Sequence, residues 1–320
     1  MVFDGHSDIL FDVTRRRLLG EQCVLTRRHL DRLRQGGVEG LILALWTGGS
    51  FWDTADPLRR LELMLSCAQA DLAQCPEFHL VRTAREAEAA RAGGKIYVFL
   101  SVEGLAPIEG DLGRLEWLRD AGVTSAMLTW NEENRLAAGA GADPKRGLTP
   151  LGREALRRMD SLGMALDVSH LGEQSFWDAL DAASPPILAS HSNCFSLCPV
   201  PRNLTDAQLT ALRDAGGVVG LNSYRGFLHR DPACQTAEAL VCHARHMAEV
   251  MGLGHVACGF DFCHFMGPGN ESGAGLETAA QIPAFFRLLR SGGWGEAELA
   301  ALGRENLLGM FPGDPAPRST

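Results

Sequence analysis

The chain has 320 residues, 46% of them hydrophobic and 22% charged, and its formal net charge is -9 at pH 7. This length exceeds that of a typical single domain, but it lies within the range of roughly 200–400 residues that a (β/α)8 barrel occupies. The acidic balance, without a run of lysine and arginine interleaved with aromatic residues, excludes a nucleic-acid-binding surface. The arginine cluster Arg15 to Arg17 is therefore interpreted as a solvated turn or the start of a helix.

Membrane segments and disulfide bonds are not expected. No apolar stretch approaches the roughly 20 residues that span a bilayer, and the N-terminal residues lack the basic and apolar regions of a signal peptide. The nine cysteines are odd in number, lie scattered from Cys23 to Cys263 and form no close CxxC pair. We therefore expect buried thiols in a reducing compartment and a cytoplasmic protein.

Eight short apolar or β-branched runs alternate with helical patterns along the chain. Helical signals include apolar residues at helical spacing in 57–65, the N-cap Thr149 with a proline in the first turn of 150–161, and 206–214 before Gly216. The runs predict strands at Phe3–Ile9, Leu41–Trp46, Ile96–Glu103, Ser125–Trp130, Met164–His170, Pro186–Ser192, Val218–Ser223 and Val256–Phe262.

Strands that alternate with helices predict an α/β protein whose parallel sheet is covered on both faces. We expect a single-domain (β/α)8 TIM barrel over residues 1–311, followed by a frayed tail over 312–320 that is rich in proline and small residues. A doubly wound open sheet is the alternative. The barrel is favoured because polar residues stand at the predicted strand ends, where barrel enzymes gather their catalytic groups. These residues are His6, Asp8, Glu103, His170, His191 and Asp261.

The first strand carries an HxD pair, His6 and Asp8. Positions i and i+2 of a strand project to the same face, so this imidazole and carboxylate can meet one cation. Taken alone, the pair is equally compatible with a turn residue and a helix cap. Glu103 ends the third strand, where a buried carboxylate is costly unless it is paired, protonated or bound to metal. Its two oxygens can bridge two metal ions, although a glutamate that points to solvent is the alternative.

His170 and His191 end two successive strands, and each follows a serine. Neutral imidazole is a favoured zinc ligand. A single histidine at a strand end is more often a satisfied polar residue, but two of them, with carboxylates on the first and third strands, predict a metal site. The other histidines are expected at the surface: His29, His79, His229, His243, His246, His255 and His264.

Asp261 lies near the end of the last predicted strand, two residues after Gly259. The glycine lets the backbone approach a neighbour closely, and Asp261 would then face the mouth of the barrel. A carboxylate beside two cations stays ionised, so it can accept a proton from metal-bound water. We therefore expect Asp261 to be a catalytic residue.

Taken in order, these pieces resemble the membrane (renal) dipeptidase family of zinc metallopeptidases, within the amidohydrolase-like barrels. Each piece alone is unspecific, but together they run in family order from residue 4 to residue 311. The matching segments are Asp4-Gly5-His6-Ser7-Asp8, Val102-Glu103-Gly104, Gly147-Leu148-Thr149-Pro150-Leu151-Gly152, Asp167-Val168-Ser169-His170, Ser190-His191-Ser192, Pro201-Arg202-Asn203, Gly259-Phe260-Asp261-Phe262 and Asn306-Leu307-Leu308-Gly309-Met310-Phe311.

The resemblance implies two zinc ions (Zn2+) per chain, bridged by Glu103 and a hydroxide. It places His6 and Asp8 at one ion, and His170 and His191 at the other. The implied function is a zinc-dependent dipeptidase that hydrolyses the amide bond of a dipeptide with the metal-bridging hydroxide. The resemblance also suggests a homodimer.

Two further roles follow from the resemblance. Asp261 would take the proton from the hydroxide and pass it to the leaving amine. Arg202 looks like the family's arginine for the terminal carboxylate of the substrate, a task that suits its planar fork because the fork can bind both oxygens at once.

Two positions depart from the family pattern. Trp130 stands where well-known animal members carry a histidine, and an indole offers one N–H donor and no charge. Asn131 or Asn134 is the candidate replacement on this substrate-binding side. The second departure is Cys263-His264, where the family commonly has Asp-Gly, so we expect a different loop at the amino end of the substrate.

Two other functions stay open. A deacylase or lactonase would use the same metals on a different small amide or ester; Arg202 and the order of the motifs speak against it, while Trp130 keeps it open. The second alternative, from a different class, is a non-catalytic barrel that binds a ligand. Such a barrel would be expected to lose metal ligands, and all five proposed ligands are present.

Overall fold

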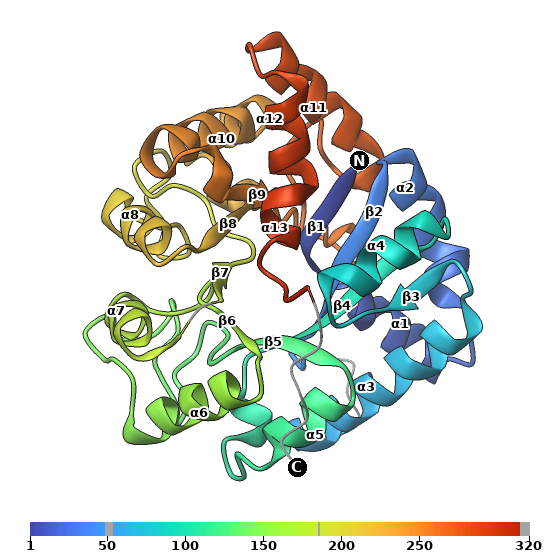
Figure 1. Cartoon of the computed structure of the whole chain (residues 1–320), viewed down its shortest axis with the longest axis vertical. Helices are drawn as coiled ribbons and strands as arrows, with labels where there is room; N and C mark the ends of the chain where they lie inside the picture. Colours follow the sequence, from blue (N-terminus) through green and yellow to red (C-terminus); the bar gives the residue numbers. More distant parts are fainter. Residues whose placement is uncertain (49–53, 185, 314–320) are drawn as a thin grey trace.

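The computed structural model describes residues 1–48, 54–184 and 186–313. These residues form a closed barrel of eight parallel strands, which surround the centre of the view in Figure 1. The pairing of β9 with β1 and of β2 with β4 completes the ring. Its strands are β1 (Val2–Ser7), β2 (Val38–Leu45), β4 (Ile96–Glu103), β5 (Val123–Met127), β6 (Ala165–Asp167), β7 (Ile187–Ala189), β8 (Val218–Leu221) and β9 (Val256–Cys258).

The predicted TIM barrel and its eight strands are confirmed, but several strands end earlier than predicted. Strand β6, for example, ends at Asp167 and does not reach His170. The reason is local: the backbone N–H of Ser169 donates to Asp167 Oδ1 (3.0 Å), so the chain leaves the strand ladder at this point. The polar residues therefore stand on the loops just beyond the strands, where a barrel carries its active site.

A ninth strand, β3 (Phe78–Leu80), is absent from the prediction. It pairs with Ile96–Val98 of β4, while β5 pairs with the later part of β4 from Leu100 onwards. Because β2 occupies the other edge of β4, β3 and β5 share one edge and β3 stays outside the ring. A strand of three residues between two helices is too short to produce a hydrophobic period.

Helices lie around the outside of the barrel (Figure 1), as expected for strands that alternate with helices. The predicted N-cap Thr149 is confirmed, since its side chain accepts from Gly152 N. The helix predicted over 57–65 begins after Asp56, whose side chain accepts from Leu58 N. The helices are α1 (Ile9–Leu18), α2 (Leu30–Gln35), α3 (Pro57–Gln74), α4 (Ala84–Ala92), α5 (Arg114–Asp120), α6 (Pro150–Ser161), α7 (Glu173–Ala182), α8 (Asp206–Asp214), α9 (Arg225–Leu228), α10 (Ala237–Met251), α11 (Ile282–Ser291), α12 (Glu296–Ala300) and α13 (Asn306–Leu308).

The N-terminal end of the barrel is closed by aromatic side chains from the two ends of the chain. Phe3 of β1 stacks on Phe99 of β4 (ring centroids 5.5 Å apart), and Phe311 stacks on Phe99 (3.9 Å). The chain is held as far as Pro312, whose carbonyl accepts from Ala84 N (2.9 Å). Residues 314–320 of the predicted tail lie outside the described residues, and the domain boundary stays a prediction.

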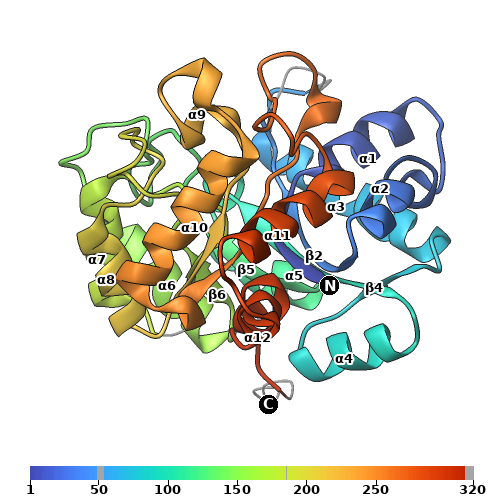
Figure 2. The ribbon, with the colours of Figure 1, turned by 90° about the horizontal axis from the view of Figure 1, so that it is seen from above.

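The two ends of the barrel therefore differ. In Figure 2, α9 lies at one end of the molecule, and α4 and α12 lie at the opposite end. Because the C-terminal segment occupies the end where the strands begin, the end where the strands finish is left for the functional site.

The prediction that the remaining histidines lie at the surface is wrong for His29 and His243, which are buried. His29 Nε2 lies 3.1 Å from Asp12 Oδ2. His243 accepts from Cys194 N through Nδ1 (3.1 Å) and faces the carbonyl of Leu228 through Nε2 (2.9 Å). A single polar residue on a helix does not reveal that partners from other elements cover it. His79 is exposed, whereas His229, His246, His255 and His264 are half-buried.

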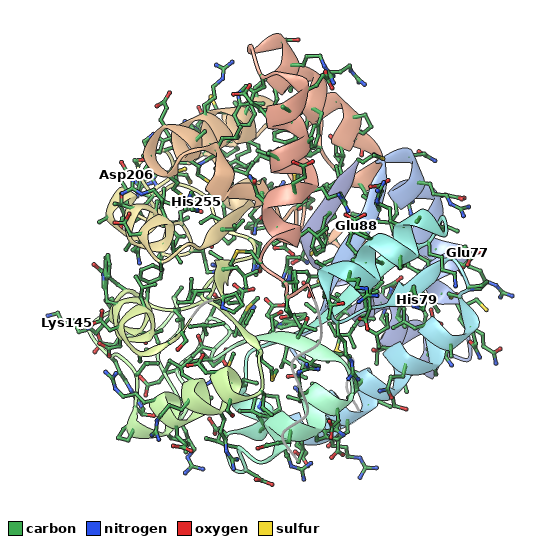
Figure 3. The ribbon with its side chains drawn as sticks, viewed as in Figure 1. Glu77, His79, Glu88, Lys145, Asp206 and His255 are labelled. Carbon is green, nitrogen blue, oxygen red and sulfur yellow. The ribbon has the colours of Figure 1, made fainter. Side chains whose placement is uncertain are left out.

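Figure 3 labels two of these residues, His79 and His255, and both lie outside the barrel together with charged residues such as Lys145.

The cluster Arg15 to Arg17 lies in the last turn of α1 and pairs with carboxylates: Arg16 with Asp12, and Arg17 with Asp71. It is therefore a helix end, not a helix start.

All nine cysteines are free, and most are buried. None of the helices that the structure describes is long and apolar enough to cross a membrane. The cytoplasmic location and the homodimer stay predictions.

Candidate metal centre and catalytic site

The candidate site lies at the ends of the barrel strands. His6 belongs to β1, and Glu103 is the last residue of β4. His170 and His191 follow shortly after β6 and β7. Asp8 comes directly before α1, beyond the irregular register between Asp4 and Ser7, so it reaches the site from a helix start and not as a strand residue.

Three glycines bring His191 into the barrel. A Cβ atom on Gly259 would lie 1.7 Å from the carbonyl oxygen of Ser190, one on Gly220 would lie 1.9 Å from it, and one on Gly5 would lie 3.1 Å from it. Strands β1 and β8 and the residue directly after β9 thus lack a side chain at the level where the chain after β7 turns inward. As a result, the His191 ring lies against the His6 ring, with centroids 3.8 Å apart. The expected close approach at Gly259 is confirmed.

We expect Gly259→Ala to destabilise the protein by roughly 1–3 kcal/mol, because the added methyl group must displace the backbone of Ser190. The measurement is the free energy of unfolding in urea. Gly254→Ala is the matched control, since a Cβ atom there would meet nothing within 4 Å. Equal stability of the two variants would contradict the steric role of Gly259.

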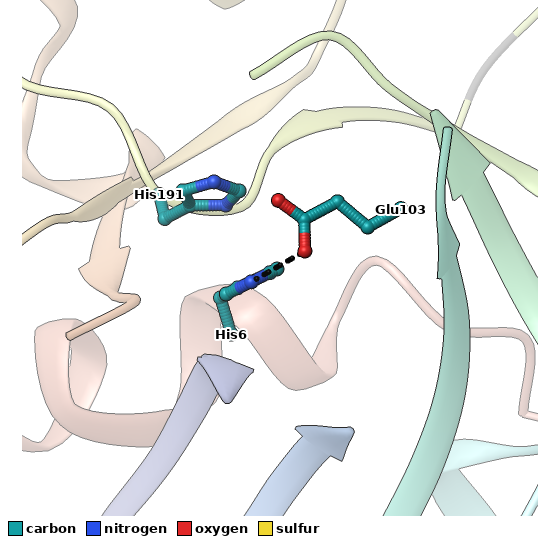
Figure 4. A group of neighbouring side chains, drawn as sticks. All are labelled: His6, Glu103 and His191. Atoms are coloured by element: carbon teal, nitrogen blue, oxygen red, sulfur yellow. Dashed lines mark ion pairs between the residues drawn. The ribbon is translucent and has the colours of Figure 1, made fainter. Parts of the chain in front are cut away.

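Glu103 faces a different histidine with each of its oxygens. Its Oε2 lies 3.3 Å from His6 Nε2, the contact drawn as a dashed line in Figure 4, and its Oε1 lies 2.9 Å from His170 Nε2. The Nε2 atoms of His170 and His191 are 2.9 Å apart. A carboxylate between two sets of imidazole nitrogens is the arrangement in which one residue can bridge two cations.

Two further carboxylates face the same His6 nitrogen. Asp8 Oδ1 lies 3.7 Å from His6 Nε2, and Asp261 Oδ1 lies 4.0 Å from it. Among the described residues, two groups of three side chains hold their ligand atoms within 4.8 Å of one another: His6, Glu103 and His191, and His6, Asp8 and Asp261. The groups share His6, so they mark adjoining positions. The resemblance assigns His191 to the same ion as His170, and the structure brings all five proposed ligands together.

Several ligand-type atoms here are buried without a hydrogen-bond partner. They are His6 Nε2, Asp8 Oδ1 and Glu103 Oε2. A buried polar atom without a partner costs about 1–3 kcal/mol, and more if it is charged. Cations between these atoms would satisfy all three, so the donor set fits the metal ions that the sequence implies. His6 Nδ1 also lacks a partner, and a cation at Nε2 does not explain that.

Burial sets the protonation of the imidazoles and carboxylates. It holds the pKa of His170 and His191 well below the usual range, helped by the charges of Arg202 and His6, so both rings are neutral, as metal binding requires. Burial, reinforced by Asp8, raises the pKa of Glu103 to about 8. Because His170 is neutral, the 2.9 Å contact between His170 and Glu103 is a hydrogen bond and not an ion pair. A cation would hold the carboxylate ionised instead.

His6 behaves differently from the other two histidines. Burial acts to lower the pKa of His6, but the negative charge of Glu103 and the contact with Asp8 outweigh this effect and raise that pKa well above its usual range. The excess of negative charge around His6 is what a divalent cation would neutralise.

A neighbouring polar side chain contacts the Nδ1 atom of each of the two imidazoles, His170 and His191. His170 Nδ1 lies 2.9 Å from Asn131 Oδ1, and His191 Nδ1 lies 2.7 Å from Ser190 Oγ. Both rings therefore turn Nε2 toward the centre of the site. Asn131, expected on the substrate side, lines the cavity but also orients His170.

Asp167 is a structural residue of the site that the sequence reasoning missed. Its Oδ1 accepts from Ser169 N (3.0 Å), Ser169 Oγ (2.7 Å) and Ser190 N (3.1 Å). One buried carboxylate thus ties together the two turns that carry His170 and His191. The sequence feature that could have indicated this role is the Ser-His pair that follows each of two consecutive strands.

Asp261 follows β9 in a left-handed backbone conformation (φ 59°), which non-glycine residues rarely adopt. Its Oδ2 accepts from Asn222 Nδ2 (3.2 Å), and its Oδ1 accepts from the thiol of Cys263 (3.2 Å). Burial raises the pKa of Asp261, although the nearby charge of His6 acts in the opposite direction. Strain at a residue held by its surroundings is typical of functional sites.

A cavity of ≈ 350 Å³ opens onto these residues. One wall is aromatic: the rings of Trp46 and Trp130 have centroids 5.6 Å apart, and Trp130 lies 6.0 Å from the His170 ring. Asn134 does not line the cavity, because its amide bonds within its own turn, to Leu128 O and to the N–H of Leu136. The lining residues are Asp8, Trp46, Glu103, Trp130, Asn131, His170, Arg202, Tyr224, Phe227, Asp261, Cys263, Met266 and Asn270.

Arg202 brings a positive charge to this cavity, as the sequence predicts. Its side chain is buried, with Nη1 donating to the carbonyl of Ser169, Nη2 lying 3.1 Å from His170 Nε2, and the Phe227 ring beneath (5.4 Å). Burial lowers the pKa of Arg202 only to about 10, so the guanidinium is charged at neutral pH. His170 Nε2 has one site for a partner, so a cation bound there would free Nη2 for a substrate oxygen.

Comparisons with known proteins agree with this geometry. The sequence model of the membrane dipeptidase family (peptidase family M19) matches residues 1–313. An uncharacterized protein in the pqqA 5′ region of Klebsiella pneumoniae is 35% identical over 232 residues, which cover 70% of this chain and 84% of that protein.

Two solved structures share the fold over nearly their whole length. A metallopeptidase from Rhodobacter sphaeroides, liganded with a phosphinate mimic of the dipeptide L-Ala-D-Ala, has a TM-score of 0.86 at 26% identity, with 97% of each chain covered. Dipeptidase AC, a metallopeptidase of family M19, has a TM-score of 0.87 at 27% identity, with 98% of this chain and 99% of that chain covered.

Proposed function

Because this chain belongs to the membrane dipeptidase family of metallopeptidases, peptidase family M19, we propose that it is a binuclear zinc dipeptidase. The observation that carries the proposal is Glu103, whose two oxygens face His6 and His170 from a buried position between them. The proposed substrate is a small free dipeptide. The phosphinate mimic of L-Ala-D-Ala in the metallopeptidase from Rhodobacter sphaeroides supports a substrate of this class.

The residues of the site have two different roles, metal binding and proton transfer. His6, Asp8, Glu103, His170 and His191 would hold two zinc ions, which when bound would activate water at neutral pH and polarise the scissile carbonyl. Asp261, held at the edge of this group, accepts a proton and returns it to the departing amine. The scissile carbonyl would lie in the cavity beside Glu103 and His170, with Trp46 and Trp130 along one side.

Arg202 binds and orients the substrate in this proposal. It is buried, charged and next to the ligand nitrogen of His170, so a carboxylate bound to it would lie close to the reacting carbonyl. A planar guanidinium can hold both carboxylate oxygens at once. A free C-terminus is therefore the feature of the substrate that the site selects.

A deacylase on another small amide is the second candidate, and Trp130 favours it. Trp130 and Trp46 form an uncharged wall beside His170, where a ligand of large apolar surface would fit as well as a dipeptide. The two candidates differ in whether a free carboxylate is needed next to the scissile bond.

We expect about two zinc equivalents per chain, because the ligand atoms form two adjoining groups that share His6. Elemental analysis of protein purified without chelator measures the metal, and a screen of L,L- and L,D-dipeptides on the same preparation measures the activity. His79→Ala, at an exposed histidine, is the matched control and should keep both. A stoichiometry of zero or one that zinc addition does not change would contradict the two-metal proposal.

A further inference from the structure

The carboxylate of Asp261 is held from both sides by side chains that are not themselves candidate ligands. Asn222 Nδ2 donates to Oδ2 (3.2 Å), and the thiol of Cys263 donates to Oδ1 (3.2 Å). We propose that Cys263 is a positioning residue for Asp261, which keeps Oδ1 directed at the metal centre. This inference rests on the proposed function, because it assumes that Asp261 carries the proton.

The two donors are not equivalent. Asn222 is fully buried and fixed by its own backbone contacts, since its Oδ1 accepts from Tyr224 N (2.7 Å). It anchors Oδ2 of Asp261. The other oxygen, Oδ1, is the one that lies 4.0 Å from His6 Nε2. Cys263 therefore acts on the oxygen that the reaction uses.

The backbone alone does not fix this carboxylate. Asp261 stands in a left-handed conformation beyond the end of β9, where its N–H reaches the carbonyl of His6 only at 3.3 Å. Two residues later the buried Cys263 lies back against the carboxylate. Without the thiol, one donor on Oδ2 would leave the carboxylate free to turn about its last side-chain bond.

Cys263 also lies near a second carboxylate. Its sulfur is 3.6 Å from Asp8 Oδ2, while Asp8 Oδ1 faces His6. The thiol thus lies between two carboxyl groups and can donate its single proton to only one of them at a time. An effect through Asp8 would change metal binding, whereas an effect through Asp261 would change turnover, so the two can be separated by measurement.

The test compares Cys263→Ala and Cys263→Ser in the zinc-loaded full chain. Cys263→Ala should lower kcat roughly threefold to tenfold with KM and zinc content unchanged, because a thiol is a weak donor whose loss costs about one ordinary hydrogen bond. Cys263→Ser should restore most of kcat, since a hydroxyl donates from the same position. Cys67→Ala, at a buried cysteine of α3, is the control and should leave kcat unchanged.

A second arm tests whether the effect passes through Asp261. In the Asp261→Asn background, Cys263→Ala should have no further effect on kcat, because the group that it positions is gone. Crystal structures of the wild type and of Cys263→Ala should show Asp261 Oδ1 turned away from His6 in the variant. An equal loss of kcat in both backgrounds, a loss of zinc, or an unmoved Asp261 would each overturn the proposal.

Failure of the proposed function looks different. A zinc-loaded wild type that cleaves another amide but no dipeptide would contradict the dipeptidase, and the Cys263 comparison would then be made on that amide. Wild-type kcat in Cys263→Ala, on an active enzyme, would contradict the positioning role alone.

Discussion

Replacing Asp261 by asparagine is expected to lower kcat by a factor on the order of 100 or more, while zinc content and folding stay close to wild type. The amide has the same shape as the carboxylate and can still accept a hydrogen bond from Asn222 or Cys263. It cannot take up the proton that the reaction releases. Asp261 lies 4.0 Å from His6 Nε2 and belongs to one of the two ligand-atom groups, so the zinc content of the variant decides whether a loss of kcat comes from the missing proton carrier or from lost metal.

The measurement is steady-state kinetics on a cleaved dipeptide, with elemental analysis of the same preparation. Asp181→Asn, at an exposed position of α7, makes the same chemical change away from the site and should leave kcat unchanged. Full zinc occupancy together with wild-type kcat in Asp261→Asn would show that the proton is carried by another group.

A free dipeptide should be cleaved at least about 20 times better than its C-terminal amide, measured as kcat/KM. The reason is Arg202, whose buried guanidinium would lose its charged partner. Leaving such a charge unmatched costs roughly 2–5 kcal/mol, and about 1.4 kcal/mol corresponds to a factor of ten. Arg202→Ala should remove most of the preference, because that variant no longer distinguishes a carboxylate from an amide.

Arg202→Lys is the matched variant for this experiment. It keeps the charge but loses the planar fork, so we expect it to retain only part of the preference for the free acid. Zinc content must be measured alongside, because Arg202 Nη2 lies 3.1 Å from the proposed ligand His170. If the wild type cleaved the free dipeptide and its C-terminal amide at equal rates, the dipeptidase function would be contradicted and the deacylase function would be favoured.

Most of the architecture of this protein could be predicted from local sequence signals, without knowledge of the contacts between distant segments. Strands such as Ile96–Glu103 and helices such as Pro150–Ser161 carry local signals, namely apolar periods and caps, which do not depend on what packs against them. The proposed ligands could also be selected, because each polar residue ends or follows an apolar run. The three-residue β3 and the buried His29 had no such signal.

Only the tertiary structure decided how these residues meet. The sequence shows that Gly259 has no side chain, but not that the carbonyl of Ser190 fills the space and carries His191 against His6. Asp167 and Cys263 likewise acquire their roles from partners on other segments or across a turn. The physical reason is that short-range signals come from the backbone's own conformational preferences. Hydrogen bonds and close packing between distant segments exist only after the barrel has closed.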